Sequence, residues 1–316
     1  MTTAIEAHGV AKSYGSLVAV ENLTFTVEPG EVLGVLGPNG AGKTTAIRVL
    51  TTILSPTHGS FSVAGIPHTR PAAIRRAVGV LPESAGYPER QTGEEYLRFH
   101  ARLFGHSRPS ARSVARTLLE DVGLAERATS LIASYSRGMR QRLGIARALV
   151  NDPRVVFLDE PTLGLDPAGQ RQILGNVRGI ASERGAAVLL CSHLLAEVEE
   201  NCSRVLILNR GHVAAAGTVA EIVRQAAAPR TARLQVAAEH MEHAVAVLTG
   251  ASGVDDVHRP DGRAGWLKVV FSRAEEGDGQ LNLAVRVLLD AGVELRAFEL
   301  EGARLSDAFL AMTEAD

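Results

Sequence analysis

The sequence predicts an α/β fold with a mainly parallel sheet covered by helices on both faces, followed by a small α+β domain. A glycine-rich turn at residues 37–44 joins a short apolar stretch to a helical one. Uninterrupted apolar stretches then alternate with helical ones, which is typical of strands buried on both faces of a parallel sheet. Beyond residue 228 the order becomes strand, helix, strand, strand, helix, strand, which is the ferredoxin-like pattern.

The composition excludes several classes of protein. The 316 residues are 46% hydrophobic and 22% charged, which is ordinary for a globular chain, and the net charge of −2 argues against a nucleic-acid binder. The two cysteines, Cys191 and Cys202, fit neither a disulfide framework nor a metal motif. No apolar run reaches the roughly 18 to 20 residues that span a bilayer, and the N-terminus does not resemble a signal peptide. We therefore expect a cytoplasmic protein.

The N-terminal region is predicted to form short strands joined by turns. Apolar and alternating stretches indicate strands at residues 4–8, 17–20 and 23–27, and a turn closes them before the next strand. Tyr14 lies in the predicted turn between the first two strands. A lone aromatic residue usually packs in a core, and a surface that stacks on a nucleotide base is the alternative.

The turn that follows matches the pattern G-x-x-x-x-G-K-[ST]. It consists of Gly37, Pro38, Asn39, Gly40, Ala41, Gly42, Lys43 and Thr44, between an apolar strand at 32–36 and a helix at 45–50. Glycines let successive N–H groups curl into a nest for phosphate oxygens, and the helix start adds a favourable dipole. We expect Lys43 to reach the β- and γ-phosphates of a nucleotide, Thr44 to ligate Mg²⁺, and Thr45 to belong to the same site.

The chain then changes from strands to helices and back. An alternating strand is predicted at 60–65, and an apolar strand at 77–81 ends close to Glu83. Residues 85–150 show the amphipathic spacing of helices. Apolar strands follow at 155–158, 186–190 and 204–208, which together with 32–36 and 77–81 supply the parallel sheet.

Two acids follow the strand at 155–158 and complete a phosphoryl-transfer site. The strand carries Asp159 to the carboxyl edge of the sheet, where it can help to hold Mg²⁺. Glu160, one residue further on, can orient and deprotonate an attacking water. The competing interpretation is that the two acids only cap the next helix. The phosphate-binding turn earlier in the chain makes the catalytic interpretation the stronger one.

At this point the chain strongly resembles the ATP-binding subunits of ABC transporters, over roughly residues 4–225. Five further features carry the resemblance in the order typical of the family. They are Tyr14 as the aromatic that stacks on adenine, residues 135–139 in place of Leu-Ser-Gly-Gly-Gln, the helix at 140–149, the loop at 161–167, and the pair Ser192 and His193. The resemblance implies a P-loop ABC ATPase core with an N-terminal antiparallel β part and a helical subdomain at about 85–150, in a domain that spans 1–228.

The same resemblance implies how the site is assembled. Two copies are expected to enclose two ATP molecules as a homodimer, each site pairing the P-loop of one chain with the signature of the other. The residues implied from the second chain are Ser136, Arg137, Gly138 and Asp166, and His193 senses the γ-phosphate. ATP and Mg²⁺ are the implied cofactors, with Thr44, Glu83 and Asp159 as metal ligands. A separate transmembrane permease subunit is the implied partner, which places the protein at the cytoplasmic face of the membrane.

Two positions depart from the pattern of the family. Arg137 and Met139 replace a glycine and a glutamine of the signature, and Glu83 stands where most members have a glutamine that touches Mg²⁺ and water. Glutamate keeps an oxygen ligand and loses the amide donor. These variants, and the end of the chain at 304–310, resemble the subgroup that serves drug, antibiotic, sodium or lipid-linked glycan exporters. Export of a drug-like, lipid or glycan cargo is therefore expected by analogy.

Two other functions compete with transport. A soluble ABC-type ATPase acting on ribosomes or DNA would carry two cassettes or long coiled coils, whereas this chain has one cassette and a short helical region. A non-catalytic regulator would not be expected to retain both Glu160 and His193.

Residues 229–316 are predicted to form an accessory α+β domain after a boundary at 226–229. Its expected core residues are Leu234, Val236, Val245, Leu248, Val269, Phe271, Val287, Leu288 and Phe298. His240 and His243 lie three residues apart on a predicted helix, but nothing nearby completes a four-ligand metal site. We expect this domain to act by packing, either between two copies or on the ATPase domain through a final helix at 305–312.

Overall fold

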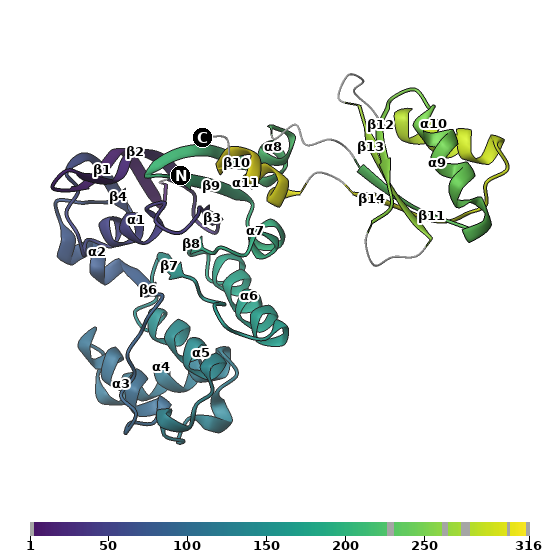
Figure 1. Cartoon of the computed structure of the whole chain (residues 1–316). Helices are drawn as coiled ribbons and strands as arrows, with labels where there is room; N and C mark the ends of the chain where they lie inside the picture. Colours follow the sequence, from purple (N-terminus) through teal and green to yellow (C-terminus); the bar gives the residue numbers. More distant parts are fainter. Residues whose placement is uncertain (1–2, 226–230, 261–264, 273–278, 302–303, 314–316) are drawn as a thin grey trace. The chain divides into compact units, whose positions relative to one another are not determined.

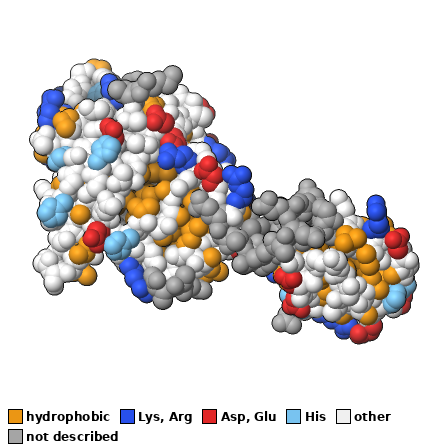
Figure 2. All heavy atoms as spheres, turned by 90° about the horizontal axis from the view of Figure 1, so that it is seen from above, with side chains coloured by type: hydrophobic (Ala, Val, Ile, Leu, Met, Phe, Trp, Pro, Cys, Tyr) orange, Lys and Arg blue, Asp and Glu red, His pale blue; other side chains and the backbone are white. Residues whose placement is uncertain are grey.

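The structure of the chain is a computed structural model that describes residues 3–225, 231–260, 265–272, 279–301 and 304–313 (Figure 1). The chain divides into two compact units between Val219 and Ala220. The boundary predicted at residues 226–229 lies outside the described residues. No helix within the described ranges is both long enough and apolar enough to cross a bilayer. On the face of the larger unit seen in Figure 2, charged side chains of both signs are interspersed, as expected for a chain of nearly balanced charge.

An antiparallel sheet begins the larger unit, with the strand order β2-β1-β4-β5. Its strands are β1 (Ile5–Tyr14), β2 (Leu17–Val27), β4 (His58–Val63) and β5 (Ile66–Pro67). The prediction of three short strands here was wrong, because β1 and β2 are two long strands. The register of their pairing shifts three times between Ala7 and Ser13, which breaks the alternation of apolar residues without ending the ladder.

The central sheet has six strands in the order β10-β9-β3-β8-β7-β6. They are β3 (Val32–Leu36), β6 (Val78–Leu81), β7 (Val155–Asp159), β8 (Ala187–Cys191), β9 (Arg204–Asn209) and β10 (His212–Thr218). All pairings are parallel except that of β10 with β9. The five parallel strands follow the predicted apolar stretches. β10 was not predicted, because its small alternating residues include three alanines and a glycine, which are poor strand formers.

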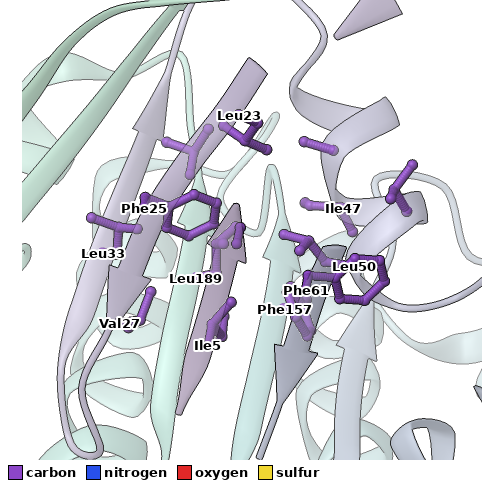
Figure 3. Packing of buried hydrophobic residues seen from close by; sticks show 14 of the residues in the cluster. Ile5, Leu23, Phe25, Val27, Leu33, Ile47, Leu50, Phe61, Phe157 and Leu189 are labelled. Atoms are coloured by element: carbon purple, nitrogen blue, oxygen red, sulfur yellow. The ribbon is translucent and has the colours of Figure 1, made fainter. Parts of the chain in front are cut away.

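Helices cover the central sheet on both faces (Figure 1). The helices of this part are α1 (Lys43–Leu50), α2 (Pro71–Ala77), α6 (Pro167–Ser182) and α7 (Leu195–Asn201), while α8 (Val219–Gln225) begins at the boundary between the two units. The core lies where α1 and the antiparallel sheet pack on the central sheet. There Leu23 and Phe25 of β2, Ile47 of α1, and Phe157 and Leu189 of the central strands belong to one buried cluster (Figure 3). This packing fixes α1, and therefore the turn before it, against the sheet.

Three helices form the helical subdomain: α3 (Gly93–Leu103), α4 (Arg108–Asp121) and α5 (Arg137–Ala148). Thr92 and Glu95 form a capping box at the start of α3, with hydrogen bonds of 3.2 and 2.9 Å in the two directions. α5 joins the subdomain to the sheet by packing on β6. Gly79 makes this possible, because a Cβ at that position would lie 2.1 Å from the carbonyl oxygen of Ala148.

The smaller unit contains a four-stranded antiparallel sheet in the order β12-β13-β11-β14. Its elements are β11 (Thr231–Val236), α9 (Met241–Thr249), β12 (Val254–His258), β13 (Trp266–Phe271), α10 (Gly279–Asp290) and β14 (Leu295–Glu301), and the last helix of the chain is α11 (Leu305–Thr313). α9 and α10 lie on one face of this sheet (Figure 1). The predicted ferredoxin-like arrangement is confirmed.

The core of the smaller unit contains most of the predicted residues. Six are buried: Leu234, Val236, Leu248, Val269, Phe271 and Leu288, while Val245 and Phe298 pack against them half-buried. Val287 is only half-buried and lies outside this cluster. His240 accepts a 3.0 Å hydrogen bond from the backbone of Glu294, so it ties the start of α9 to the chain before β14. No group of three metal-ligating side chains occurs within the described ranges.

The close approach of α5 to β6 generates a stability prediction. We expect Gly79→Ala to lower the midpoint of thermal unfolding, because the new methyl group would overlap a backbone carbonyl and cost about 1–3 kcal/mol. Gly175→Ala in α6 is the matched control, since no atom lies within 4 Å of its Cβ position. Alanine there should raise stability by about 0.5–1 kcal/mol, as in other helix interiors. Equal midpoints for the two variants would contradict the packing at Gly79.

Candidate nucleotide-binding and catalytic site

The P-loop, residues 37–44, is wound tightly between neighbouring strands. A Cβ on Gly37 would lie 2.4 Å from the carbonyl oxygen of Leu208, and one on Gly42 would lie 2.4 Å from that of Ala19. Gly42 also has a φ of 102°, a left-handed conformation that favours glycine. It caps α1 without any side-chain hydrogen bond. The first N–H groups of α1 are therefore available to an anion.

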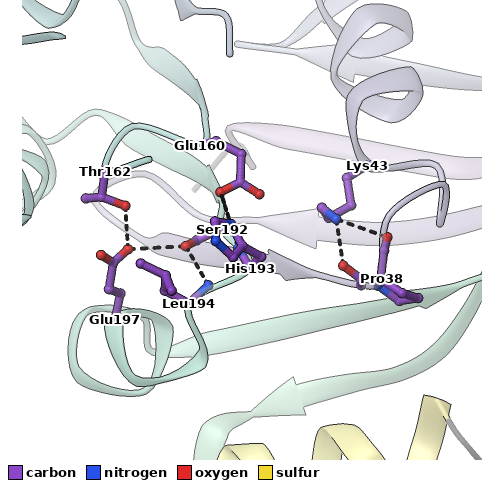
Figure 4. Close-up of polar contacts among 9 residues, drawn as sticks. Pro38, Lys43, Glu160, Thr162, Ser192, His193, Leu194 and Glu197 are labelled. Carbon is purple, nitrogen blue, oxygen red and sulfur yellow. Dashed lines mark hydrogen bonds and ion pairs between the residues drawn. The ribbon is translucent and has the colours of Figure 1, made fainter. Parts of the chain in front are cut away.

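Lys43 is buried at the start of α1, and its ammonium group bends over the loop. Its Nζ donates hydrogen bonds to the carbonyl oxygens of Gly37 at 2.6 Å and Pro38 at 3.2 Å (Figure 4). An ammonium group has three N–H donors, so one remains for another acceptor. The loop thus presents a fixed positive charge and free backbone donors to the same space, which suits phosphate oxygens.

Asp159, at the end of β7, is the centre of an acidic cluster beside the P-loop. Burial raises the pKa of its carboxyl group, a hydrogen bond with the Thr44 side chain opposes the rise, and the negative charges of Glu83 and Glu160 add to it. One oxygen of Asp159, Oδ1, is buried without a hydrogen-bond partner among the described residues. A hydroxyl, an unpaired buried carboxylate oxygen and a nearby acid are the hard oxygen donors that Mg²⁺ prefers. The residues present therefore fit this ion.

Glu160 and His193 form a pair that the sequence did not reveal. Glu160 has a φ of 51°, which is uncommon for a residue other than glycine, and its backbone N–H donates to the carbonyl of Cys191 at 2.9 Å. Its Oε2 lies 2.6 Å from Nδ1 of His193 and 3.4 Å from the backbone nitrogen of the same residue (Figure 4). With Nδ1 as the donor to the carboxylate, Nε2 of His193 remains for another contact.

A buried network lies directly behind this pair. Glu197 of α7 accepts hydrogen bonds from the hydroxyls of Thr162 and Ser192 (Figure 4). The sequence analysis assigned no role to Glu197. An acid in an ordinary helical stretch carries no signal of its burial, and its spacing of four residues from His193 is the one hint that the sequence offers.

The signature residues lie in a different place from the P-loop. Ser136, Arg137, Gly138 and Asp166 line a hollow of about 370 Å³, and no P-loop residue lines it. Ser136 caps α5 by accepting from Met139 N at 3.2 Å, and Asp166 caps α6 by accepting from Gly169 N at 3.2 Å. Two helix N-termini thus open into one hollow, and the hydroxyl proton of Ser136 remains free to donate. The signature residues and the P-loop residues therefore line separate spaces in one chain.

Arg137 and Tyr14 occupy exposed positions. The guanidinium group of Arg137 covers Gly164, because a Cβ on that glycine would lie 2.4 Å from one of its nitrogens. Tyr14 is the last residue of β1 and does not lie within the turn as predicted. Its side chain is 46% exposed, and the ammonium of Lys12 lies 5.4 Å from the ring centroid. The ring is thus open to a flat partner and already carries a cation nearby.

Comparison with known proteins identifies the family to which the chain belongs. A model of the family described as ABC transporter matches residues 20–163. The daunorubicin resistance ATP-binding protein DrrA3 of Streptomyces coeruleorubidus is 35% identical over 99% of this chain and 97% of its own length. The Nod factor export ATP-binding protein I of Paraburkholderia xenovorans (strain LB400) is 41% identical over 70% of this chain and 72% of its own.

Solved structures agree with this. An ATP-binding subunit of an ABC transporter matches with a TM-score of 0.64 and 34% identity, covering 71% of this chain and 93% of that one. A dimeric ATP-binding cassette bound to ADP and Pi matches with a TM-score of 0.62 over 68% of this chain and 98% of that one, and at 24% identity it supports the fold alone. The chain belongs to the ABC transporter family as one of its ATP-binding, ATP-hydrolysing subunits.

Proposed function

We propose that the chain is the ATPase subunit of an exporter and that Glu160 is the general base of ATP hydrolysis. The observation that carries this proposal is the place of Glu160 directly after the end of β7. Its carboxylate is oriented by Nδ1 of His193, which lies 2.6 Å from it. The residue itself comes directly after Asp159, the buried acid beside the P-loop. A carboxylate held in this way can orient a water molecule and accept its proton.

The other residues take roles that follow from their contacts. Lys43 and the free N–H groups of the P-loop hold the β- and γ-phosphates, and the imidazole ring of His193 contacts the γ-phosphate. Thr44, Asp159 and Glu83 are the ligands for Mg²⁺, which when bound would neutralise charge on the phosphate oxygens. Tyr14 provides an exposed ring for stacking on adenine. Glu83 supplies an oxygen at the point where the chain leaves β6 for the helical subdomain.

The separation of the two half-sites supports a composite site in a homodimer. The hollow lined by Ser136, Arg137, Gly138 and Asp166 contains none of the P-loop residues of its own chain. Two helix N-termini and the exposed Arg137 side chain give it the character of an anion site. We propose that it receives the phosphates of an ATP molecule held by the P-loop of a second copy, with Mg²⁺ present at each P-loop.

A groove beside the helical subdomain supports docking of the membrane subunit. Its volume is about 960 Å³, and exposed apolar side chains such as Ile53, Leu103 and Phe104 line it together with Arg76. A family member that powers transport needs a contact with a membrane protein, and exposed apolar side chains in one groove are typical of an interaction site. We propose that a short, largely apolar cytoplasmic segment of a separate permease occupies it, at the cytoplasmic face of the membrane.

The names of the relatives bear on the cargo. They include daunorubicin and doxorubicin resistance proteins and Nod factor export proteins. We therefore propose export of a drug-like or lipid or glycan molecule. The cargo would contact the permease, so this chain carries no cargo site in the proposal. The alternative of an ATPase acting on ribosomes or DNA is not favoured by these relatives.

The role of Glu160 leads to the first functional prediction. Glu160→Gln should reduce ATP turnover by at least about 100-fold, because the amide cannot accept the proton, while ATP binding is retained. Lys43→Ala should lose ATP binding as well, since it removes the charge that holds the phosphates. Turnover is measured as phosphate release and binding by equilibrium dialysis. Wild-type turnover in Glu160→Gln would disprove the assignment of the base.

The composite site predicts complementation between inactive chains. Lys43→Ala and Ser136→Arg chains should each be inactive alone. A mixture should recover up to about a quarter of the wild-type rate, because half of the random dimers pair one intact P-loop with one intact signature. A mixture of Lys43→Ala with Glu160→Gln is the control and should stay inactive, since both changes damage the P-loop side. Normal hydrolysis by Ser136→Arg alone would exclude a composite site.

If the groove binds the membrane subunit, a change in the groove should weaken that binding without affecting ATP hydrolysis. Leu103→Asp should reduce co-purification with the membrane subunit several-fold, because a charged group would enter an apolar contact, while the ATPase rate of the isolated chain stays normal. Leu289→Asp is the matched control, with 57% exposure against 66% for Leu103, and it lies on α10 of the smaller unit. Equal co-purification of both variants would argue against docking in the groove.

A further inference from the structure

Glu197 is a buried acid to which the proposed chemistry assigns no role. It lies on α7, and its side chain has little contact with solvent. Its Oε2 accepts two hydrogen bonds, from the hydroxyl of Thr162 at 2.7 Å and from the hydroxyl of Ser192 at 3.2 Å. Both hydroxyl residues are completely buried. One carboxylate oxygen thus joins two loops that follow neighbouring strands of the sheet.

These two loops are the ones that carry the catalytic pair. Thr162 follows Glu160 by two residues, and Ser192 directly precedes His193. The hydroxyl oxygen of Ser192 also accepts from the backbone nitrogen of Leu194 at 3.0 Å, which fixes the turn on the other side of the histidine. The oxygen of Glu197 therefore links the two loops on which Glu160 and His193 lie (Figure 4).

The other end of the network is anchored in α6. Asn201 donates from Nδ2 to the carbonyl oxygen of Glu197 at 2.7 Å, and its Oδ1 accepts a hydrogen bond from Arg178. α7 has seven residues and no side-chain cap at its start, and the hydrogen bond from Arg178 ties its last residue to α6. Glu197 is consequently attached to a fixed element, as a residue that orients others must be.

Burying the carboxyl group of Glu197 costs free energy that an apolar residue at the same place would not. Burial raises the pKa of Glu197, and the hydrogen bonds from Thr162 and Ser192 oppose the rise. Its second oxygen, Oε1, is buried with no hydrogen-bond partner among the described residues. An apolar side chain of similar size would fill the same space without this penalty. The presence of a hydrogen-bond acceptor at this buried position indicates that its role is to bind the hydroxyls of Thr162 and Ser192.

We propose that Glu197 is a positioning residue for ATP hydrolysis, which holds the loops of Glu160 and His193 at the separation that their 2.6 Å contact requires. The inference rests on the proposed role of Glu160. In addition, the orientation of Glu160 depends on Glu197. Loss of the acceptor oxygen lets the two loops move apart, so the base loses its orientation while the P-loop still holds ATP.

The test compares three variants of the full chain with the wild type. Glu197→Leu keeps the volume and removes the acceptor, and we expect kcat to fall about tenfold or more, because small displacements of a catalytic group are costly. KM for ATP and the stoichiometry of ATP binding should change less than about twofold, as expected for an interaction needed in the transition state. Glu197→Gln keeps one carbonyl oxygen for both hydroxyls and should recover most of kcat. Glu200→Gln, at an exposed position of the same helix, should match the wild type.

A second measurement separates positioning from simple loss of stability. Thr162→Val should also lower kcat, and the double variant with Glu197→Leu should be no worse than Glu197→Leu alone, because both remove the same contact. Parallel losses of kcat and of ATP-binding stoichiometry, or a wild-type kcat in Glu197→Leu, would overturn the inference. Failure of the proposed function would look different, since Glu160→Gln would then keep its turnover whatever the Glu197 variants show.

Discussion

The register of the three parallel strands β3, β8 and β7 is the constraint on which the site depends. Val35 and Asp159 both pair with Cys191, so the three strands end at the same level of the sheet. The P-loop, the acids and the loop of His193 therefore begin side by side. A slip of one residue would turn every side chain of a strand to the opposite face. The fully buried apolar residues of these strands thus determine the geometry of the proposed catalytic groups.

The sequence was informative where local pattern and local structure coincide. The P-loop pattern needs glycines for close backbone approach, and the structure shows that approach at Gly37 and Gly42. The parallel strands are buried on both faces, so their apolar runs were recognisable. The sequence pattern failed to predict strands where their pairing is irregular or their residues are small. The shifting register between β1 and β2 concealed their length, and the alanine-rich β10 has little strand character.

The candidate site could be predicted as a set of residues but not as a set of contacts. Motif spacing identified Lys43, Asp159, Glu160 and His193 one at a time. That Glu160 meets His193 depends on how two loops lie after folding, and spacing along the chain does not contain this. Glu197 was missed for a related reason, since a buried acid and a solvated one look alike in a helical sequence. The separation of Ser136 from the P-loop is likewise a tertiary property.

α5 connects the two hollows that we propose as binding surfaces for other molecules. Arg137 at its first turn lines the hollow between the two helix N-termini, and Arg147 near its last turn lines the groove on the far side. The helix has 12 residues, about 18 Å in length, and its contact with β6 at Gly79 is too close to admit a side chain between them. An occupant of the groove and an occupant of the hollow would therefore contact the same helix. Any coupling between their two binding free energies would be reciprocal: a permease segment that changed the affinity for ATP would have its own affinity changed by ATP by the same factor.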